Sequence, residues 1–155
     1  MLWRRDGTPG QPSLWSTGSA LAYIGHETAI ARLVVGIRCR IATLEYDERA
    51  LLDTACTWSV LSSEVADELT DAIGSPFQTI SFDTRLGTFS GALHRIPIQL
   101  IADEGDHLDV DATVAVLPEW PGPTVLGFHG FMERIRFALD PGSAEAQPLL
   151  FFGKP

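Results

Sequence analysis

The feature that most constrains the fold is a series of short runs in which apolar and polar residues alternate. Residues 32–44 form such a run, in which Val35, Ile37, Cys39 and Ile41 fall on one face. A period of two is that of a strand that buries one of its faces. Further alternating runs cover residues 96–100 and 110–116, and turn-forming residues separate the runs. The sequence therefore predicts a domain built mainly from short β-strands.

A single helix stands out among these strands. Ser62 and Ser63 are suited to cap its start, and Val65, Leu69 and Ile73 follow at i, i+4 and i+8. This spacing predicts one helix of about ten residues with an apolar face.

Other segments complete the predicted elements. Residues 80–82 and 89–93 flank a glycine-bearing segment and predict a hairpin with an exposed tip. Residues 131–134 predict one helical turn, and residues 135–139 and 149–152 predict two further strands. Many short strands with one main short helix favour a mostly β fold, a small closed β-barrel, over a sheet of βαβ units.

Composition sets the class of protein. The chain has 155 residues, of which 45% are apolar and 20% charged, and this suits one globular domain with a buried core. Its formal net charge of -9 opposes binding to phosphate backbones and to anionic lipid. No apolar run approaches the roughly 18 residues that a membrane-spanning helix needs. We therefore expect neither a nucleic-acid partner nor a membrane partner.

The start of the chain differs from the rest. Residues 1–19 are rich in Gly, Pro, Ser and Thr, which predicts a flexible N-terminal arm before a β domain over residues 20–155. Two arginines near the start are followed by glycine and proline instead of an apolar stretch, so we expect no export signal. The expected location is the cytoplasm, with Cys39 and Cys56 as free thiols.

An aspartate followed by threonine ends the apolar run 50–52, at Asp53 and Thr54. An Asp-Thr pair alone is a weak signal. Its commonest role is to open a turn in which the aspartate side chain accepts a hydrogen bond from a nearby backbone amide. The longer segment around the pair carries more information.

The segment 51–61, LLDTACTWSVL, resembles the active-site segment of retropepsin-like aspartic peptidases. That pattern has two apolar residues, Asp-Thr-Gly-Ala, two variable positions, then Ser or Thr and two aliphatics. Downstream, Val125-Leu126-Gly127 and residues 131–139 resemble the second conserved part of the family, and residues 80–93 resemble its hairpin flap. These parts follow one another in the family's order over a span of about 110 residues, roughly 33–140.

The resemblance implies a function and a set of site residues. It implies an aspartic endopeptidase that acts as a homodimer, because one chain supplies one Asp-Thr motif and the chemistry needs two carboxylates. Asp53, Thr54 and Ala55 would form the catalytic loop. The hairpin tip, Thr84-Arg85-Leu86-Gly87-Thr88, would close over an extended polypeptide substrate. No cofactor and no metal is implied.

This chain departs from the family pattern at the site itself. Ala55 stands where glycine is usual, and at a positive φ its Cβ would cost about 1–2 kcal/mol. The acidic residue and the arginine that pair in retroviral members correspond to Thr57 and Phe128 here. A dimer would therefore need another contact, and Trp58 near Phe128 is an apolar candidate for it. The alternative function is therefore a catalytically impaired peptide-binding or dimerisation module of the same fold.

Other candidate sites are weaker. The four histidines, His26, His94, His107 and His129, show no metal-binding spacing. Cys56 has no general base placed near it by the sequence. The acidic segment 103–111 lacks the pattern of an EF-hand loop and predicts a solvated turn. The apolar segment 149–152 either completes the core or joins a sheet between subunits, and the sequence leaves both open.

Overall fold

A computed structural model describes residues 15–24, 35–84, 87–142 and 146–155. Residues 1–14 of the expected arm lie outside this part, and the expected boundary at residue 19 falls inside the first strand. In chain order the elements are β1 (Gly18–Leu21), β2 (Tyr23–Ile24), β3 (Val35–Ile41), β4 (Glu48–Leu52), β5 (Ser59–Val60), α1 (Ser63–Glu68), β6 (Gln78–Thr84), β7 (Gly87–Leu100), β8 (Glu104–Gly105), β9 (Leu108–Val116), β10 (Val125–Leu126), the 3-10 helix η1 (Met132–Arg134), β11 (Arg136–Asp140) and β12 (Leu149–Gly153).

Six strands close into a barrel in the order β3-β4-β10-β5-β9-β7. The ring closes because the end of β7 returns to β3, where Leu100 pairs with Cys39 and Ile98 with Ile41. The β4–β10 and β5–β9 pairs are parallel, and the other pairs of the ring are antiparallel. The predicted mostly β fold, a closed barrel with one main helix, is therefore confirmed.

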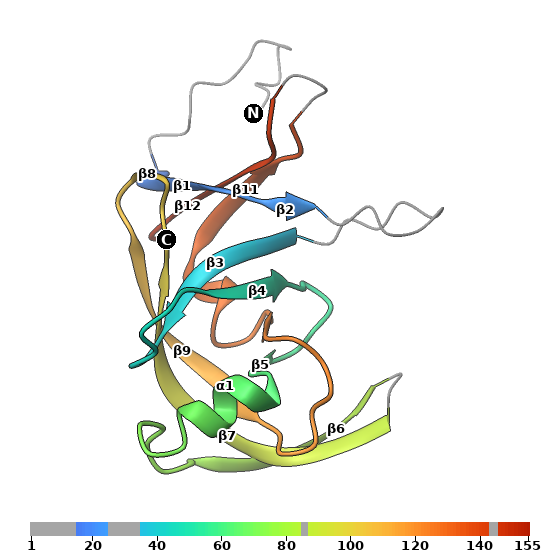
Figure 1. Ribbon diagram of the computed structural model, residues 1–155. Helices are drawn as coiled ribbons and strands as arrows, with labels where there is room; N and C mark the ends of the chain where they lie inside the picture. The colour runs from blue at the N-terminus through green and yellow to red at the C-terminus, as the bar shows by residue number, and fades with distance from the viewer. Residues whose placement is uncertain (1–14, 25–34, 85–86, 143–145) are drawn as a thin grey trace.

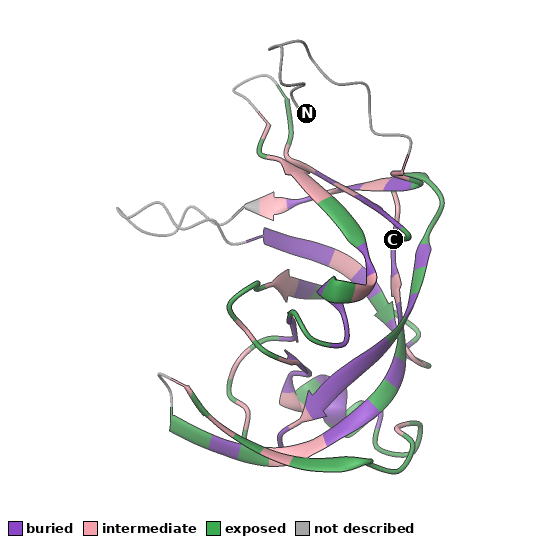
Figure 2. Ribbon diagram, turned by 180° about the vertical axis from the view of Figure 1, so that it is seen from behind, coloured by how far each residue is buried: buried purple, intermediate pink, exposed green. Residues whose placement is uncertain are grey.

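The barrel encloses the apolar residues that the alternating pattern assigned to one face. Ile37, Cys39 and Ile41 of β3 are buried, as are Ile98 and Leu100 of β7. Their removal from water is the main driving force for closing the ring. Figure 2 shows buried residues along the barrel strands and many exposed residues on the β6–β7 hairpin.

A second, four-stranded sheet has the order β11-β12-β1-β8. It lies at one end of the molecule, and the β6–β7 hairpin lies at the opposite end (Figure 1). Its strand β12 pairs with β1 on one side and with β11 on the other. Leu150 and Phe152 of β12 are fully buried. The two alternatives for residues 149–152 are thereby resolved, because this strand completes the core of its own chain.

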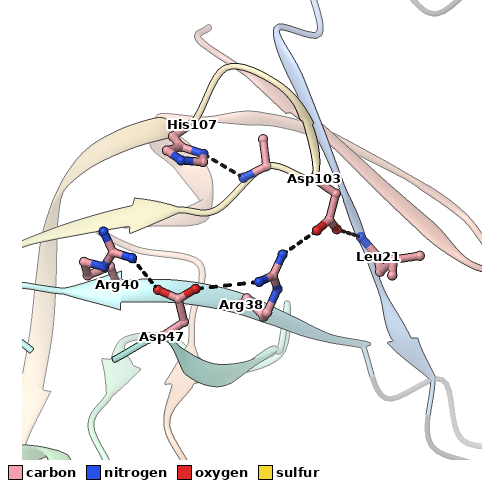
Figure 3. A network of polar contacts seen from close by, with 7 residues as sticks. Leu21, Arg38, Arg40, Asp47, Asp103 and His107 are labelled. Atoms are coloured by element: carbon pink, nitrogen blue, oxygen red, sulfur yellow. Dashed lines mark hydrogen bonds and ion pairs between the residues drawn. The ribbon is translucent and has the colours of Figure 1, made fainter. Parts of the chain in front are cut away.

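The acidic segment after β7 is more than the solvated turn that we expected. Its residues Glu104 and Gly105 form β8 and pair with β1. The carboxylate of Asp103 accepts a hydrogen bond from the Leu21 amide at 2.7 Å and forms an ion pair with Arg38 (Figure 3). The segment therefore ties the small sheet to barrel strand β3.

The helix begins as predicted and ends sooner. The Ser62 hydroxyl accepts a hydrogen bond from the Val65 amide at 3.3 Å, which is the expected N-cap. Helix α1 then stops at Glu68 after six residues. The Thr70 hydroxyl bonds to the Ala66 carbonyl at 3.2 Å, and the chain continues as turns.

Candidate functional site

The end of β4 fixes the position of the candidate catalytic aspartate. Strand β4 lies parallel to β10, with Leu52 beside Leu126. Asp53 follows directly, and its amide donates to the carbonyl of the fully buried Leu126 at 3.1 Å. Two residues earlier on each segment, the Leu51 amide donates to the Thr124 carbonyl at 2.9 Å. The backbone of Asp53 is thus held by the barrel, while its side chain is exposed.

Two hydrogen bonds shape the loop after this aspartate. The Ala55 amide donates to Oδ1 of Asp53 at 2.9 Å, and the Cys56 amide donates to the Asp53 carbonyl at 3.2 Å. This is the turn that ordinary Asp-Thr chemistry predicts. The bond from the Ala55 amide also fixes the orientation of the Asp53 carboxylate. Oδ2 has no hydrogen-bond partner among the described residues, so one oxygen is held and the other is available.

A buried serine joins the Asp53 loop to the segment after β10. Ser59 is fully buried, and its Oγ accepts a hydrogen bond from the Gly127 amide at 3.0 Å. Gly127 lies so close to this loop that an added Cβ would stand 2.4 Å from the Trp58 carbonyl oxygen. The close approach therefore requires glycine. The two sequence segments that resemble the peptidase family are in direct contact.

Ala55 does not carry the strain that an alanine would have at a left-handed position. Among the described non-glycine residues, only Ala42 has a positive φ. The energetic penalty that we considered for Ala55 therefore does not apply, although its methyl group still lies beside Asp53. The Thr54 side chain is exposed, and its hydroxyl has no hydrogen-bond partner within the described ranges. Its bond across a twofold axis stays a prediction.

Main-chain bonds join the loop after Asp53 to the segment after β10. The Phe128 amide donates to the Cys56 carbonyl at 2.9 Å, and the His129 amide donates to the Thr57 carbonyl at 2.8 Å. The predicted contact between Trp58 and Phe128 runs through His129, whose ring centroid lies 5.5 Å from each of theirs. Phe128 remains 47% exposed.

His129 also lies next to a carboxylate. Its Nδ1 is 3.2 Å from Oε2 of Glu133, and the Gly130 amide donates to Oε1 of Glu133 at 2.6 Å. The Gly130 hydrogen bond lowers the pKa of Glu133, and the contact with His129 lowers it further. Glu133 is therefore held as an anion at the edge of the aromatic group Trp58, His129 and Phe128.

The thiol in the loop after Asp53 is not activated. Cys56 is half-buried, and its Sγ donates to the Trp58 carbonyl at 3.0 Å. Burial raises the pKa of Cys56, and the negative charge of Asp53 raises it further. A neutral thiol is a poor nucleophile.

A cleft of about 710 Å³ separates the Asp53 loop from strand β6. This volume is in the range of sites that bind small molecules or short peptides. Its lining consists of Asp53, Ala55, Cys56, Thr57, Trp58, Gln78, Thr79, Ile80, Ser81, Phe82, Asp83, Thr84 and Trp120. Both Asp53 and Ala55 of the predicted catalytic loop therefore face one cleft with β6.

The predicted substrate-binding residues are only partly in this cleft. Thr84 lines it, and Gly87 pairs with Thr84 in the hairpin. Thr88 bonds through its hydroxyl to the Asp83 carboxylate. Arg85 and Leu86 lie outside the described residues. Among the described residues, those of β6 make up most of this wall.

Besides most of β6, sequence reasoning missed Trp120 as a residue of the cleft wall. It lies in the proline-rich loop between β9 and β10, and its ring contacts Phe89 edge to face at 5.4 Å. Its indole nitrogen donates to the Pro123 carbonyl at 2.9 Å. A tryptophan in a loop of prolines and glycine is a detectable signal, because its large apolar ring favours packing against another apolar group while its N–H finds a hydrogen-bond acceptor.

The described residues hold no group of three or more His, Cys, Asp or Glu side chains arranged to bind a metal ion. In the same part of the chain, no helix has both the length and the apolar character that crossing a membrane requires.

Comparisons with known proteins show a distant likeness. No family model matches the sequence, and no curated protein matches it. Among solved structures, a retropepsin-like aspartic protease from Rickettsia conorii aligns with 88% of this chain and 91% of its own, at 12% identity and a TM-score of 0.49. The crystal structure of edgp aligns with 94% of this chain at 12% identity and a TM-score of 0.50, and this chain spans about half (48%) of its length. The likeness is one of fold, and it assigns no chemistry to this chain.

Proposed function

We propose that this protein is an aspartic endopeptidase that acts as a homodimer, with Asp53 of each copy forming the catalytic pair. One observation carries the proposal. Asp53 lines the cleft opposite β6, its Oδ1 is held by the Ala55 amide, and its Oδ2 has no partner among the described residues. A carboxylate that is fixed through one oxygen and available through the other is suited to share a proton with a second acid.

The proposed reaction needs two carboxylates in different protonation states. An ionised carboxylate takes a proton from water, and the resulting hydroxide attacks the scissile carbonyl carbon. A neutral carboxylic acid donates its proton to the carbonyl oxygen. The tetrahedral intermediate then collapses and the C–N bond breaks: the leaving nitrogen takes the proton that the first carboxylate accepted from water, and one hydroxyl of the intermediate returns a proton to the second carboxylate. Two like charges close together cannot both ionise, so Asp53 and Asp53 of the partner subunit would hold one proton between them.

The proposed substrate is an extended polypeptide. Strand β6 is at one edge of the larger sheet, next to β7, and it lines the cleft. An edge strand offers unpaired backbone groups that an extended peptide can bond as an added strand. Ile80 and Phe82 are half-buried at the same wall and give it apolar surface.

Cleavage of a peptide library, read by mass spectrometry at about pH 4–6, tests the proposal. The wild type should cleave. Asp53→Asn should reduce the cleavage rate by at least about 10²-fold, because general acid–base catalysis contributes a rate enhancement of at least that size. Asp71→Asn is the matched control, since it makes the same change on an exposed turn outside the cleft and leaves Asp53 intact. Equal cleavage by the wild type and Asp53→Asn would reject the proposal.

One observation favours the alternative, a peptide-binding module without turnover. The Ala55 methyl group lines the cleft beside Asp53, where it narrows the approach. Ala55→Gly distinguishes the two functions. Cleavage that appears or strongly increases in this variant indicates an obstructed catalytic pair. Peptide binding without cleavage in both forms supports the module.

A further inference from the structure

His129 contacts the candidate site from outside the cleft. Trp58 is part of the cleft lining, whereas His129 is not among the described residues of that lining. The rings of the two residues pack with their centroids 5.5 Å apart, and their backbones form a parallel β-bridge. The His129 amide also donates to the Thr57 carbonyl at 2.8 Å. A change at the His129 ring therefore reaches the cleft through Trp58.

The backbone of Trp58 is held firmly, and its ring lies at a boundary. The Trp58 carbonyl accepts a hydrogen bond from the Cys56 thiol at 3.0 Å. The side chain is half-buried and packs against an apolar cluster that includes Val60 and Leu117. The ring thus borders this cluster, the cleft and His129. Its exact position in the cleft wall depends in part on what His129 offers it.

The His129 ring is placed between two aromatic rings and a carboxylate. Its centroid is 5.5 Å from those of both Trp58 and Phe128, and its Nδ1 is 3.2 Å from Oε2 of Glu133. Histidine is the side chain that ordinarily changes its charge between pH 5 and 8. A protonated ring here is a cation within the roughly 6 Å range of cation–π attraction to two rings. It also forms an ion pair with the anion four residues further along.

Other charged groups near His129 do not compete for this role. The titratable and charged groups on the elements around it are Glu133 and Arg134 of η1, Asp111 of β9, and Asp53 and Cys56 of the loop after β4. Arg134 and Asp111 lie 3.8 Å from each other and form their own ion pair. Burial raises the pKa of the Cys56 thiol, so it stays neutral. Among the described residues, only Glu133 forms an ion pair with His129.

We propose that His129 is a positioning residue for the cleft. Its protonated ring, held by Glu133, fixes the Trp58 ring in the cleft wall, so the cleft binds extended peptide more tightly in acid than at neutral pH. His129 itself touches no substrate. The inference rests on the proposed function, because it takes the cleft beside Asp53 as the peptide-binding site.

NMR of the tryptophan indole N–H groups tests the contact without any ligand. Between pH 8 and pH 5, the Trp58 indole signal should shift together with the ring signals of His129 and with the same midpoint. The Trp120 indole signal is the internal control and should not follow, since Trp120 lines the same cleft but packs against Phe89. His129→Gln should abolish the Trp58 shift, and so should His129→Arg, whose planar cation keeps its charge at every pH used.

Retention of a histidine-free peptide library on immobilised Asp53→Asn measures peptide affinity without turnover. Affinity should be about two- to fivefold higher at pH 5.5 than at pH 7.5, which is the equivalent of one exposed cation–π contact. Asp53→Asn combined with His129→Gln should bind weakly at both pH values, and combined with His129→Arg it should bind tightly at both. His107→Gln is the matched control, since it alters an exposed histidine outside the described cleft lining.

The inference fails if the Trp58 signal does not follow His129, or if His129→Gln leaves the pH dependence of retention unchanged. It also fails if no peptide is retained at either pH. Cleavage is measured separately with Asp53 intact. Retention that follows the charge of His129 without any cleavage would reject the peptidase and keep the inference. Cleavage whose KM at pH 5.5 is unchanged by His129→Gln would keep the peptidase and reject the inference.

Discussion

The buried hydrogen bond between Ser59 and Gly127 gives a quantitative prediction. Ser59→Ala removes the only described acceptor of the Gly127 amide, which is in a buried residue. An unsatisfied buried donor costs about 1–3 kcal/mol. For a domain of this size each kcal/mol lowers Tm by about 2–4 °C, so the melting temperature should fall by roughly 2–12 °C.

Urea unfolding, monitored by tryptophan fluorescence, measures the corresponding loss in the free energy of unfolding. The midpoint should fall with an unchanged slope, because the change affects the native state and not the surface exposed on unfolding. Ser90→Ala is the matched control. The Ser90 hydroxyl bonds to the Ser81 hydroxyl at 3.1 Å on the exposed hairpin, and its loss should change stability by no more than about 0.5 kcal/mol. If the two variants are equally stable, the contact between the two segments does not anchor the Asp53 loop as we argue.

Three further predictions concern the same region. The pKa of Glu133 is lower in the folded than in the unfolded protein. Its contribution to stability is therefore present above the unfolded pKa of about 4.3 and is lost as the pH falls through the folded value. Glu133→Gln should lower the urea midpoint at pH 7 and leave it unchanged at pH 2. Ala55→Gly should lower the free energy of unfolding by about 0.4–1 kcal/mol, because glycine gives the unfolded chain more conformational freedom. The folded state gains nothing in return, since Ala55 has no positive φ for glycine to relieve. An increase in Tm measured by calorimetry would contradict this. Asp53→Asn should speed alkylation of Cys56 by iodoacetamide at pH 8, since the Asp53 charge raises the pKa of that thiol; an unchanged rate would mean that the two groups do not interact.

The local parts of the fold were predictable because local sequence determines them. The alternation of Val35, Ile37, Cys39 and Ile41 identified β3, since a period of two matches only a strand with one buried face. The N-cap at Ser62 was predictable from side-chain chemistry for the same reason. The early end of α1 was not, because the apolar spacing continues to Ile73, whereas the Thr70 amide bonds to the carbonyl three residues back, at Asp67, instead of four residues back.

The pairing of strands far apart in the sequence could not be predicted from the local pattern. Closure of the ring depends on β3 meeting the far end of β7, and no local signal at Cys39 or Leu100 specifies that partner. The same limit applied to the site. Asp53 and Gly127 were identified by resemblance to a family, whereas the contribution of β6 and Trp120 to the cleft became visible only when distant segments were brought together.

The central place of β12 in the small sheet bears on how the chain is made. Strand β1 is synthesised early, yet its main partner is not available until residues 149–153 have left the ribosome. During that interval the barrel strands can already associate, while β1 and the apolar edge that it later covers remain open. Pairings between such distant segments form slowly, and the unfinished intermediate is prone to aggregate. We therefore expect translation rate and chaperone supply to affect the yield of this protein.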